Sequence, residues 1–306
     1  MRRGGCYTFC VRQLIVNADD FGLTAGVNRA IVETHTGGIV SSATLMANGA
    51  AFDDAVERAR ATPTLSVGCH VVLVDGKPVS EPDAVDTLLA IRSAEPDKFH
   101  SRLPVVAARA VFGGFDPDQL VEEITAQIRT IQSAGLEPTH LDTHKHTHVF
   151  PEILAALVRA GRICGVPALR NPFVPVAAVR APQFAGKLRL WKRYGQVRML
   201  RSFARQFRVK VRRAGLLTPD GIVGVVETGS FNTSLLRQAL TNLPEGTWEL
   251  VCHPGYDDAD LRAARTRLID SRDQERRLLM SEDLRTFLHQ QNIRLISYRE
   301  FAGSRS

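Results

Sequence analysis

Long apolar runs are missing from this sequence of 306 residues, and their absence limits where the protein can work. A membrane-spanning helix needs roughly 18 predominantly apolar residues in succession, and no part of the chain provides them. A secretory signal is not recognisable either, because Arg12 and Gln13 interrupt the apolar residues that follow the charged N-terminus. We therefore expect a cytoplasmic protein whose residues 1–12 form a flexible lead.

Cysteine is scarce and odd in number, which argues against a disulfide framework. Cys6 and Cys10 lie close together, but the sequence has no second pair that would complete a structural zinc site. Most of the other cysteines lie in apolar runs and are expected to be small core residues. This usage fits a reducing compartment. The five cysteines are Cys6, Cys10, Cys69, Cys164 and Cys252.

Carboxylates are absent between Glu152 and Asp220, although the whole chain carries a net charge of +7. Arg and Lys are densest in residues 187–213, where Trp191, Tyr194, Phe203 and Phe207 lie among them. Such a segment suits an anionic membrane surface, which would place the protein at the inner face of the membrane. A solvated helical face explains the same pattern, and both interpretations stay open. We expect no nucleic-acid partner, and the sequence leaves a homodimer open.

The alternation of strand-like and helical segments predicts an α/β protein. The pattern runs nearly to the end of the chain, without internal repeats or linkers. We expect residues 13–306 to form a single-domain, distorted or incomplete (β/α) barrel of about seven parallel strands. Two excursions leave this pattern, near residues 75–115, a candidate lid or substrate loop, and near 175–220. The clearest strands are 14–16, 42–46, 65–72, 168–170, 222–226, 248–253 and 293–297; the clearest helices are 25–36, 52–60, 117–133, 233–243 and 271–290.

Polar side chains follow several of these strands. The first strand ends at Asp19 and Asp20, which should point to opposite faces and therefore do different work. One of them could instead cap the next helix. His70 lies in the third strand, and His253 ends a later one. Since parallel strands bring their carboxyl ends to one face of a barrel, these groups can converge on a divalent metal.

A histidine cluster precedes the helix that begins at Pro151. His140, His144, His146 and His148 alternate as in a strand, so all of them could share one face, with some only bordering the site. His70 taken alone has a plainer explanation, because a single histidine in an apolar run is more often a satisfied core residue. Four histidines within nine residues, opposite a double aspartate, favour a metal site.

Four motifs together resemble the YdjC-like carbohydrate deacetylases. They occur in order along the chain, and the resemblance extends from Gln13 to Ser297. Within this family, residues 72–79 and the His144-Lys145-His146 form of the histidine motif are most similar to the branch associated with hopanoid biosynthesis. The four motifs are Asn17-Ala18-Asp19-Asp20-Phe21-Gly22, Gly68-Cys69-His70, His140-Leu141-Asp142-Thr143-His144-Lys145-His146 and His253-Pro254-Gly255-Tyr256.

The resemblance implies a metal-dependent deacetylase and assigns its residues. Asp20, His70 and His144 match the metal ligands, for Mg²⁺ or Zn²⁺, with His146 as a reserve ligand. Asp19 matches the general base, His253 the general acid, and Arg170 a residue that positions Asp19 or the substrate. The implied substrate is an acetylated amino sugar, lipid-linked as in an N-acetylglucosaminyl hopanoid; a chito-oligosaccharide is the alternative.

Two other classes of function compete with this interpretation. A phosphoesterase with two metals would need more bridging carboxylates than Asp19, Asp20 and Asp142, the acidic residues near the motifs. A non-catalytic protein that binds membranes or nucleic acid would explain the basic segment, but it would not need the intact aspartate pair and histidine motifs.

Overall fold

The computed structural model describes residues 12–90, 96–174, 203–224, 229, 232–264 and 266–304. Its centre is one parallel sheet of seven strands, in which β1 (Arg12–Phe21) is the longest. β6 (Gly246–Cys252) pairs with one edge of β1. The other edge is shared, because β7 (Ile293–Ile296) pairs with its first half and β2 (Ser42–Leu45) with its second. Nearly every residue of β1 is buried, as expected for a central parallel strand.

The sheet continues on both sides of β1 and curls towards closure. β3 (Ser66–Val71) and β4 (Leu141–Thr143) follow β2, and β5 (Gly221–Val223) pairs with β6. Isolated bridges extend the sheet beyond β4, from Leu141 to Leu169 and from Ala168 to Leu217. The Ile222 N–H also donates to the Phe173 carbonyl, so residues 168–173 lie between β4 and β5. The predicted incomplete (β/α) barrel of about seven parallel strands is confirmed.

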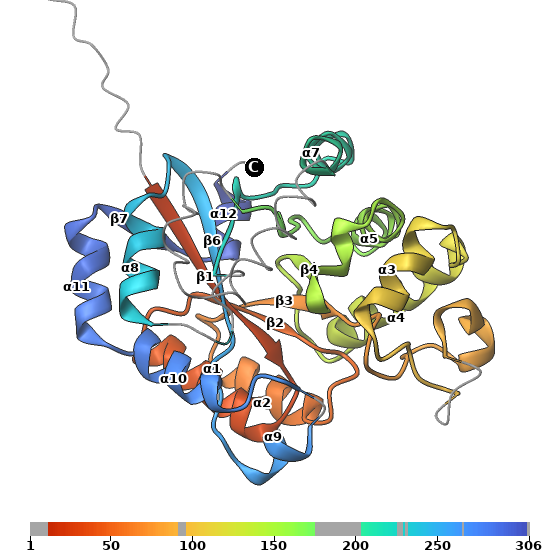
Figure 1. Cartoon of the computed structure of the whole chain (residues 1–306), viewed down its shortest axis with the longest axis horizontal. Coiled ribbons are helices and arrows are strands. Elements are labelled where there is room, and N and C mark those ends of the chain that lie inside the picture. The colour runs from red at the N-terminus through yellow and green to blue at the C-terminus, as the bar shows by residue number, and fades with distance from the viewer. Residues whose placement is uncertain are drawn as a thin grey trace, which may run out of the picture.

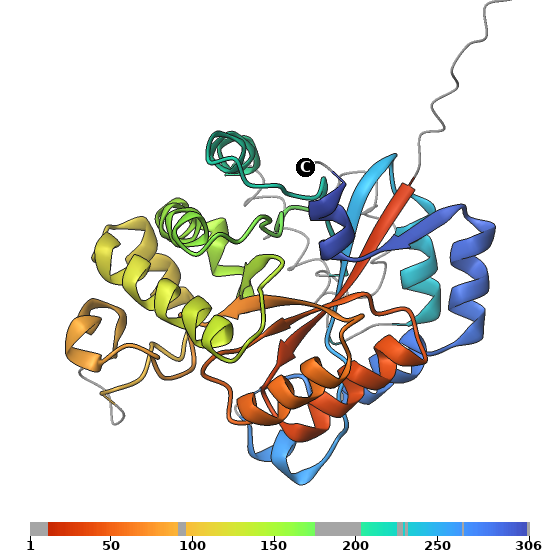
Figure 2. The ribbon, with the colours of Figure 1, turned by 180° about the vertical axis from the view of Figure 1, so that it is seen from behind.

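Helices surround this sheet, as Figures 1 and 2 show from opposite sides. Their starts follow from local chemistry: the Thr24 hydroxyl accepts the Val27 N–H, and Asp116 caps a helix whose first residue is Pro117. No helix of the described residues is long and apolar enough to cross a bilayer. The helices are α1 (Ala25–Thr36), α2 (Phe52–Ala61), α3 (Leu103–Val111), α4 (Pro117–Ser133), α5 (Pro151–Ile163), α7 (Ala204–Arg213), α8 (Thr233–Thr241), α9 (Ala259–Ala263), α10 (Asp270–Leu279), α11 (Glu282–Gln290) and α12 (Tyr298–Gly303).

Two helical predictions need correction or completion. The charged helix expected over residues 271–290 is two helices, α10 and α11, because the Ser281 side chain accepts the Leu284 N–H and starts a new helix there. The excursion near 75–115 contains α3 and two short 3₁₀ helices, η1 (Pro82–Ala84) and η2 (Asp86–Leu88). Residues 175–202 of the second excursion lie outside the described residues.

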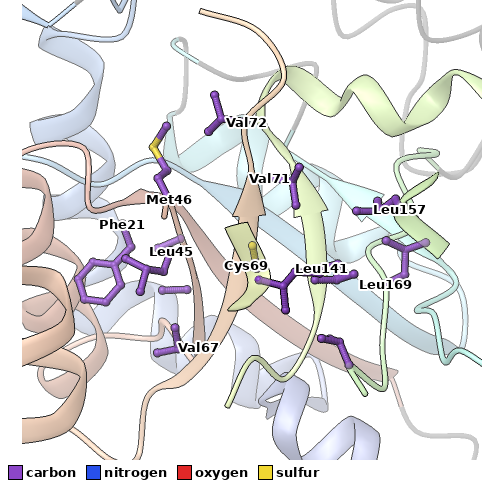
Figure 3. Close-up of a cluster of buried hydrophobic side chains, with 14 of the residues drawn as sticks. Phe21, Leu45, Met46, Val67, Cys69, Val71, Val72, Leu141, Leu157 and Leu169 are labelled. Atoms are coloured by element: carbon purple, nitrogen blue, oxygen red, sulfur yellow. The ribbon is translucent and has the colours of Figure 1, made fainter. Parts of the chain in front are cut away.

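The strand alternation separates the core into an outer and an inner part. Leu14, Val16 and Ala18 of β1 belong to the large cluster between sheet and helices, whereas Ile15 packs inside the barrel with Tyr298. On β3, Val67, Cys69 and Val71 likewise face the large cluster, where Figure 3 shows them near Leu45 and Leu141. The alternate residues of these strands, which include Asn17, Asp19, Gly68 and His70, are therefore left to line the barrel interior.

The histidine cluster is not a strand, and the expectation that its histidines share one face is wrong. β4 ends at Thr143, and His144–Val149 form a 3₁₀ helix (η3) in which Lys145 and His146 have positive φ angles of 55° and 54°. The Thr143 hydroxyl accepts the His148 N–H at 3.0 Å and thereby stabilises this turn towards α5. The turn sends the histidines in different directions.

Gly68 lets two inner strands approach each other closely. A Cβ at this position would lie 2.5 Å from the His140 ring and 2.6 Å from its carbonyl oxygen. Ala normally stabilises a strand by about 0.5–1 kcal/mol relative to Gly. Gly68→Ala should instead reduce the free energy of unfolding by about 1–3 kcal/mol, because the strands must shift. Denaturant unfolding measures this change.

Gly37→Ala is the matched control, since the nearest atom to its added Cβ is the terminal methyl of Met280 at 3.3 Å. It should change stability by no more than about 0.5 kcal/mol. A Gly68→Ala protein as stable as the wild type would show that the two strands are not in tight contact.

Candidate metal centre and acid–base site

The carboxyl ends of neighbouring strands bring the predicted polar groups together. Asp19 and Asp20 lie near the end of β1, and His70 near the end of β3. His144 directly follows β4, and His253 directly follows β6. The sheet order places β4, β3, β2, β1 and β6 side by side, so these groups meet at one end of the barrel. This is the end at which parallel α/β proteins carry their chemistry.

A bulge at the end of β1 turns both aspartates into the site. The pairing of β1 with β2 shifts register between Ala18 and Phe21, and Asp20 has a φ angle of 66°. A bulge of this kind re-aims side chains beside functional sites. The two carboxylates therefore do not point to opposite faces, as simple alternation predicted. They do have different partners.

Asp20, His70 and His144 form the predicted donor group. The Oδ1 atom of Asp20 lies 3.5 Å from Nε2 of His70 and 3.3 Å from Nδ1 of His144. The two ring nitrogens are 3.2 Å apart. Oδ1 is buried and has no hydrogen-bond partner among the described residues, so its lone pairs are available. Two imidazole nitrogens and a carboxylate oxygen aimed at one point fit a divalent metal.

Further side chains hold these donors in place. Asp142 accepts from Nδ1 of His70 at 2.7 Å, which leaves Nε2 to face the donor group. Although burial alone would lower the pKa of His70, the neighbouring Asp142 raises it to about 9. Arg272 donates to the second oxygen of Asp20 at 2.5 Å. Glycine at position 255 leaves room for the Arg272 side chain, because a Cβ there would lie 2.9 Å from the Cδ atom of Arg272.

Asp19 is held by a buried arginine. Arg170 donates to its two oxygens at 2.9 and 2.6 Å, and the Asn17 amide donates to it at 3.0 Å. Burial would raise the pKa of Asp19, but the Arg170 guanidinium outweighs it and holds that pKa well below its usual range. Arg170 also contacts Glu249 at 2.7 Å and forms an ion pair with Asp142. The carboxylate of Asp19 is thus ionised and fixed in orientation.

A second group of donors, Asp19, His70 and Asp142, is also compact. It is less suited to a metal, because the Arg170 guanidinium already pairs with both of its carboxylates. The positive charge of Arg170 would repel a metal ion bound at these carboxylates. The group around Asp20 is therefore the better candidate.

His253 lies beside Asp19. Its Nε2 is 3.9 Å from Asp19, and its side chain is 12% exposed. Burial lowers the pKa of His253 to about 4, so the imidazole is neutral at pH 7. Its main-chain N–H donates to Glu275 at 2.6 Å, and its Nδ1 lies 4.0 Å from the same oxygen. Burial raises the pKa of Glu275 to about 7.

The other histidines of the cluster have different surroundings. His140 stacks on the Tyr298 ring at 3.6 Å and contacts the Asn17 amide oxygen at 3.0 Å. It therefore helps to hold Asn17, whose amide N–H donates to Asp19. His148 contacts the Thr143 hydroxyl at 2.6 Å. His146, the reserve ligand, belongs to neither donor group.

Sequence patterns missed several residues of this site. The sequence motifs give Asp142 no role beyond that of a nearby acidic residue, and they do not include Glu249, Arg272 or Glu275. Asp142 lies in β4 within the histidine motif itself, two residues before His144, and this position could have marked it as a site residue. Arg272 and Glu275 come from α10, more than 200 residues after β1, within a helix as charged as any surface helix. Only the fold reveals them.

Two known proteins are similar to nearly the whole length of this chain, and a third is similar to about half of it. A carbohydrate deacetylase of Thermoanaerobacter pseudethanolicus is 29% identical over 288 residues, which cover 94% of this chain and 98% of that protein. A carbohydrate deacetylase of Brevibacillus brevis is 32% identical over 291 residues, or 94% of this chain and 99% of that protein. A chitooligosaccharide deacetylase of Salmonella is 43% identical over 154 residues, or 48% of this chain and 55% of that protein.

A solved structure supports the fold. It is a protein from Enterococcus faecalis described as a cellobiose-phosphate cleavage protein, with a TM-score of 0.75 and 24% identity. The match covers 95% of this chain and 99% of that one. Residues 13–290, which contain all four sequence motifs and every site residue described above, match the family described as YdjC-like protein. The chain therefore belongs to the YdjC-like protein family.

Proposed function

We propose that this protein is a metal-dependent hydrolase that removes the acetyl group from an acetylated amino sugar. The observation that carries the proposal is the separation of roles: Asp20, His70 and His144 form a donor group, while Asp19 and His253 flank it without joining it. The names of the relatives, carbohydrate and chitooligosaccharide deacetylases, agree with this chemistry.

The donor set indicates which metal the site prefers. Imidazole ligands suit zinc and similar transition metals, whereas Mg²⁺ prefers oxygen ligands. Two histidines and one carboxylate therefore favour Zn²⁺ over Mg²⁺. When bound, such an ion polarises the acetamide carbonyl and lowers the pKa of a water molecule towards about 7.

The protein's own residues move the protons. Asp19 accepts the proton of the attacking water, and Arg170 keeps its carboxylate ionised and correctly oriented. His253 is neutral at the outset, so it must acquire the proton that it gives to the leaving amine. Asp19, whose oxygen lies 3.9 Å from Nε2, can supply it. The proton thus moves from Asp19 to His253 and then to the amine. Each acceptor is a stronger base than the donor, because the pKa rises from Asp19 to His253 and from His253 to an amine.

The finer proposal concerns the substrate, a lipid-linked amino sugar as in an N-acetylglucosaminyl hopanoid. The specific support is α7, the described part of the basic segment 187–213. Its Phe207 and Val211 are buried, whereas Arg205, Arg208 and Arg212 are exposed and α7 carries no acidic residue. Such a face suits anionic lipid headgroups. A chito-oligosaccharide is the alternative substrate, and acetate release from a panel of both types decides between them.

The metal ligands can be tested one at a time. Asp20→Ala, His70→Ala and His144→Ala should each lower bound metal and acetate release together, because a three-ligand site cannot lose one without weakening. Chelation of the wild-type protein should have the same effect, and Zn²⁺ should restore activity. Metal content per protein, measured by mass spectrometry, gives the answer.

His146→Ala is the control and should keep its metal, since His146 lies outside the donor group. Loss of metal in this variant and retention in His144→Ala would mean that the ligands are assigned in the wrong register.

The role of Asp19 is separable from that of the ligands. Asp19→Asn should retain the metal and lose about 10²–10⁴-fold in kcat, the usual contribution of a general base. The paired measurements are metal content and the rate of acetate release. If the variant loses its metal, the two aspartates have been interchanged.

The basic face of α7 predicts salt-sensitive membrane binding. Each basic residue near an anionic surface adds about 1 kcal/mol, screened over roughly 8–10 Å at physiological salt. Replacing Arg205, Arg208 and Arg212 by Glu should abolish sedimentation with vesicles that contain an anionic phospholipid. Hydrolysis of a small soluble substrate should persist, because no site residue lies on α7.

Reversal of three exposed arginines elsewhere, Arg262, Arg277 and Arg285, controls for net charge. Equal loss of binding in both triple variants would reduce the effect to overall charge, and binding that is indifferent to salt would refute it.

A further inference from the structure

The helix α10 carries two wholly buried charged side chains into the site. Arg272 is 0% and Glu275 1% exposed, and they lie three residues apart on the same face of the helix. Burying a charge costs several kcal/mol unless a partner compensates for it. Arg272 has its partner in Asp20. The question is what Glu275 does.

Glu275 contacts His253 at two points. Its Oε2 atom accepts the His253 main-chain N–H at 2.6 Å and lies 4.0 Å from the ring's Nδ1. The ring's other nitrogen, Nε2, faces Asp19 at 3.9 Å. The imidazole is therefore placed between two carboxylates, one on the side of the reaction and one behind it.

One buried ring atom of His253 is unsatisfied. Its Nδ1 has no hydrogen-bond partner among the residues that the structure describes, and Oε2 of Glu275 lies 4.0 Å from it. A buried donor without a partner is costly, and a carboxylate is an acceptor. A 4.0 Å separation is too long for a hydrogen bond, but the carboxylate still favours a proton on Nδ1 by electrostatic attraction.

We propose that Glu275 is a positioning residue for His253: it fixes the main chain at the N–H, accepts the Nδ1–H, and so presents Nε2 to the leaving group. The proposal rests on the proposed function, in which His253 protonates the leaving amine. An imidazole that takes up a proton at Nε2 must already carry its other proton at Nδ1. An acceptor behind the ring secures that tautomer and stabilises the cation, as a carboxylate does for the histidine of hydrolytic triads.

Glu275→Gln tests this assignment with little change of shape. The carbonyl oxygen of the amide can still accept the His253 N–H, but the neutral amide has no charge that would favour a proton on Nδ1. The proton of the imidazole should therefore move from Nδ1 to Nε2. The tautomer is read by NMR of the ring nitrogens in full-length protein labelled at histidine, with His253 assigned by the signals lost in His253→Gln.

The expected result has two parts. In Glu275→Gln the His253 ring should shift towards the Nε2–H tautomer, and kcat should fall by at least about 10-fold, within the range of a general acid's contribution. KM and metal content should stay within about twofold. Asp273→Asn, the same change on the solvent-facing side of α10, should alter neither the tautomer nor kcat.

An unchanged His253 tautomer in Glu275→Gln overturns the proposal, whatever happens to activity. If that variant does not fold, Glu275→Asp decides in the same way, because a side chain shorter by one methylene withdraws the acceptor from Nδ1. The tautomer is measured without any substrate. A protein that hydrolyses no acetamide but shows the tautomer shift would therefore refute the proposed function and leave the role of Glu275 intact.

Discussion

The arrangement of the site depends on one buried guanidinium. Arg170 is wholly buried and pairs with Asp19, Asp142 and Glu249, so one positive charge is shared by three buried acidic side chains. Removing one partner of such a buried cluster commonly costs about 3–5 kcal/mol, because the remaining charges lose their compensation. The same contacts fix the Asp19 carboxylate and hold Asp142, which accepts from His70. Structure and proposed chemistry thus rely on the same side chain.

The side chains inside the barrel change from apolar at the amino ends of the strands to polar at the carboxyl ends. This gradient explains how so many charged groups are buried there. At the amino ends of the strands, Ile15 packs against Tyr298 and Phe301. Glu249 of β6, the register partner of Ile15, accepts the Tyr298 hydroxyl at 2.5 Å, and two residues further along β1 Asn17 contacts His140. Beyond them lie Asp19, Arg170 and the donor group. An apolar layer therefore supports a polar one, and the polar one holds the site rigid.

Much of this could be predicted from the sequence. Strands and helices follow from local periodicity, and the Asp19-Asp20, His70 and His253 motifs mark strand ends because polar residues there interrupt apolar runs. What failed was inference about side-chain direction. The bulge at Asp20 and the left-handed residues Lys145 and His146 break the alternation on which such inference rests. Arg272 and Glu275 could not be found, because a buried charge on a helix looks like an exposed one until its partner is known.

The central claim is that one metal is held by Asp20, His70 and His144 while Asp19 remains with Arg170. The most direct test is a crystal structure of the protein grown with Zn²⁺, with anomalous diffraction recorded at the zinc edge. The account predicts a single anomalous peak at about 2.0–2.2 Å from an Asp20 oxygen, Nε2 of His70 and Nδ1 of His144, with the Asp19–Arg170 pair intact. A peak bound by Asp19 and Asp142, or by His146 in place of His144, would contradict it.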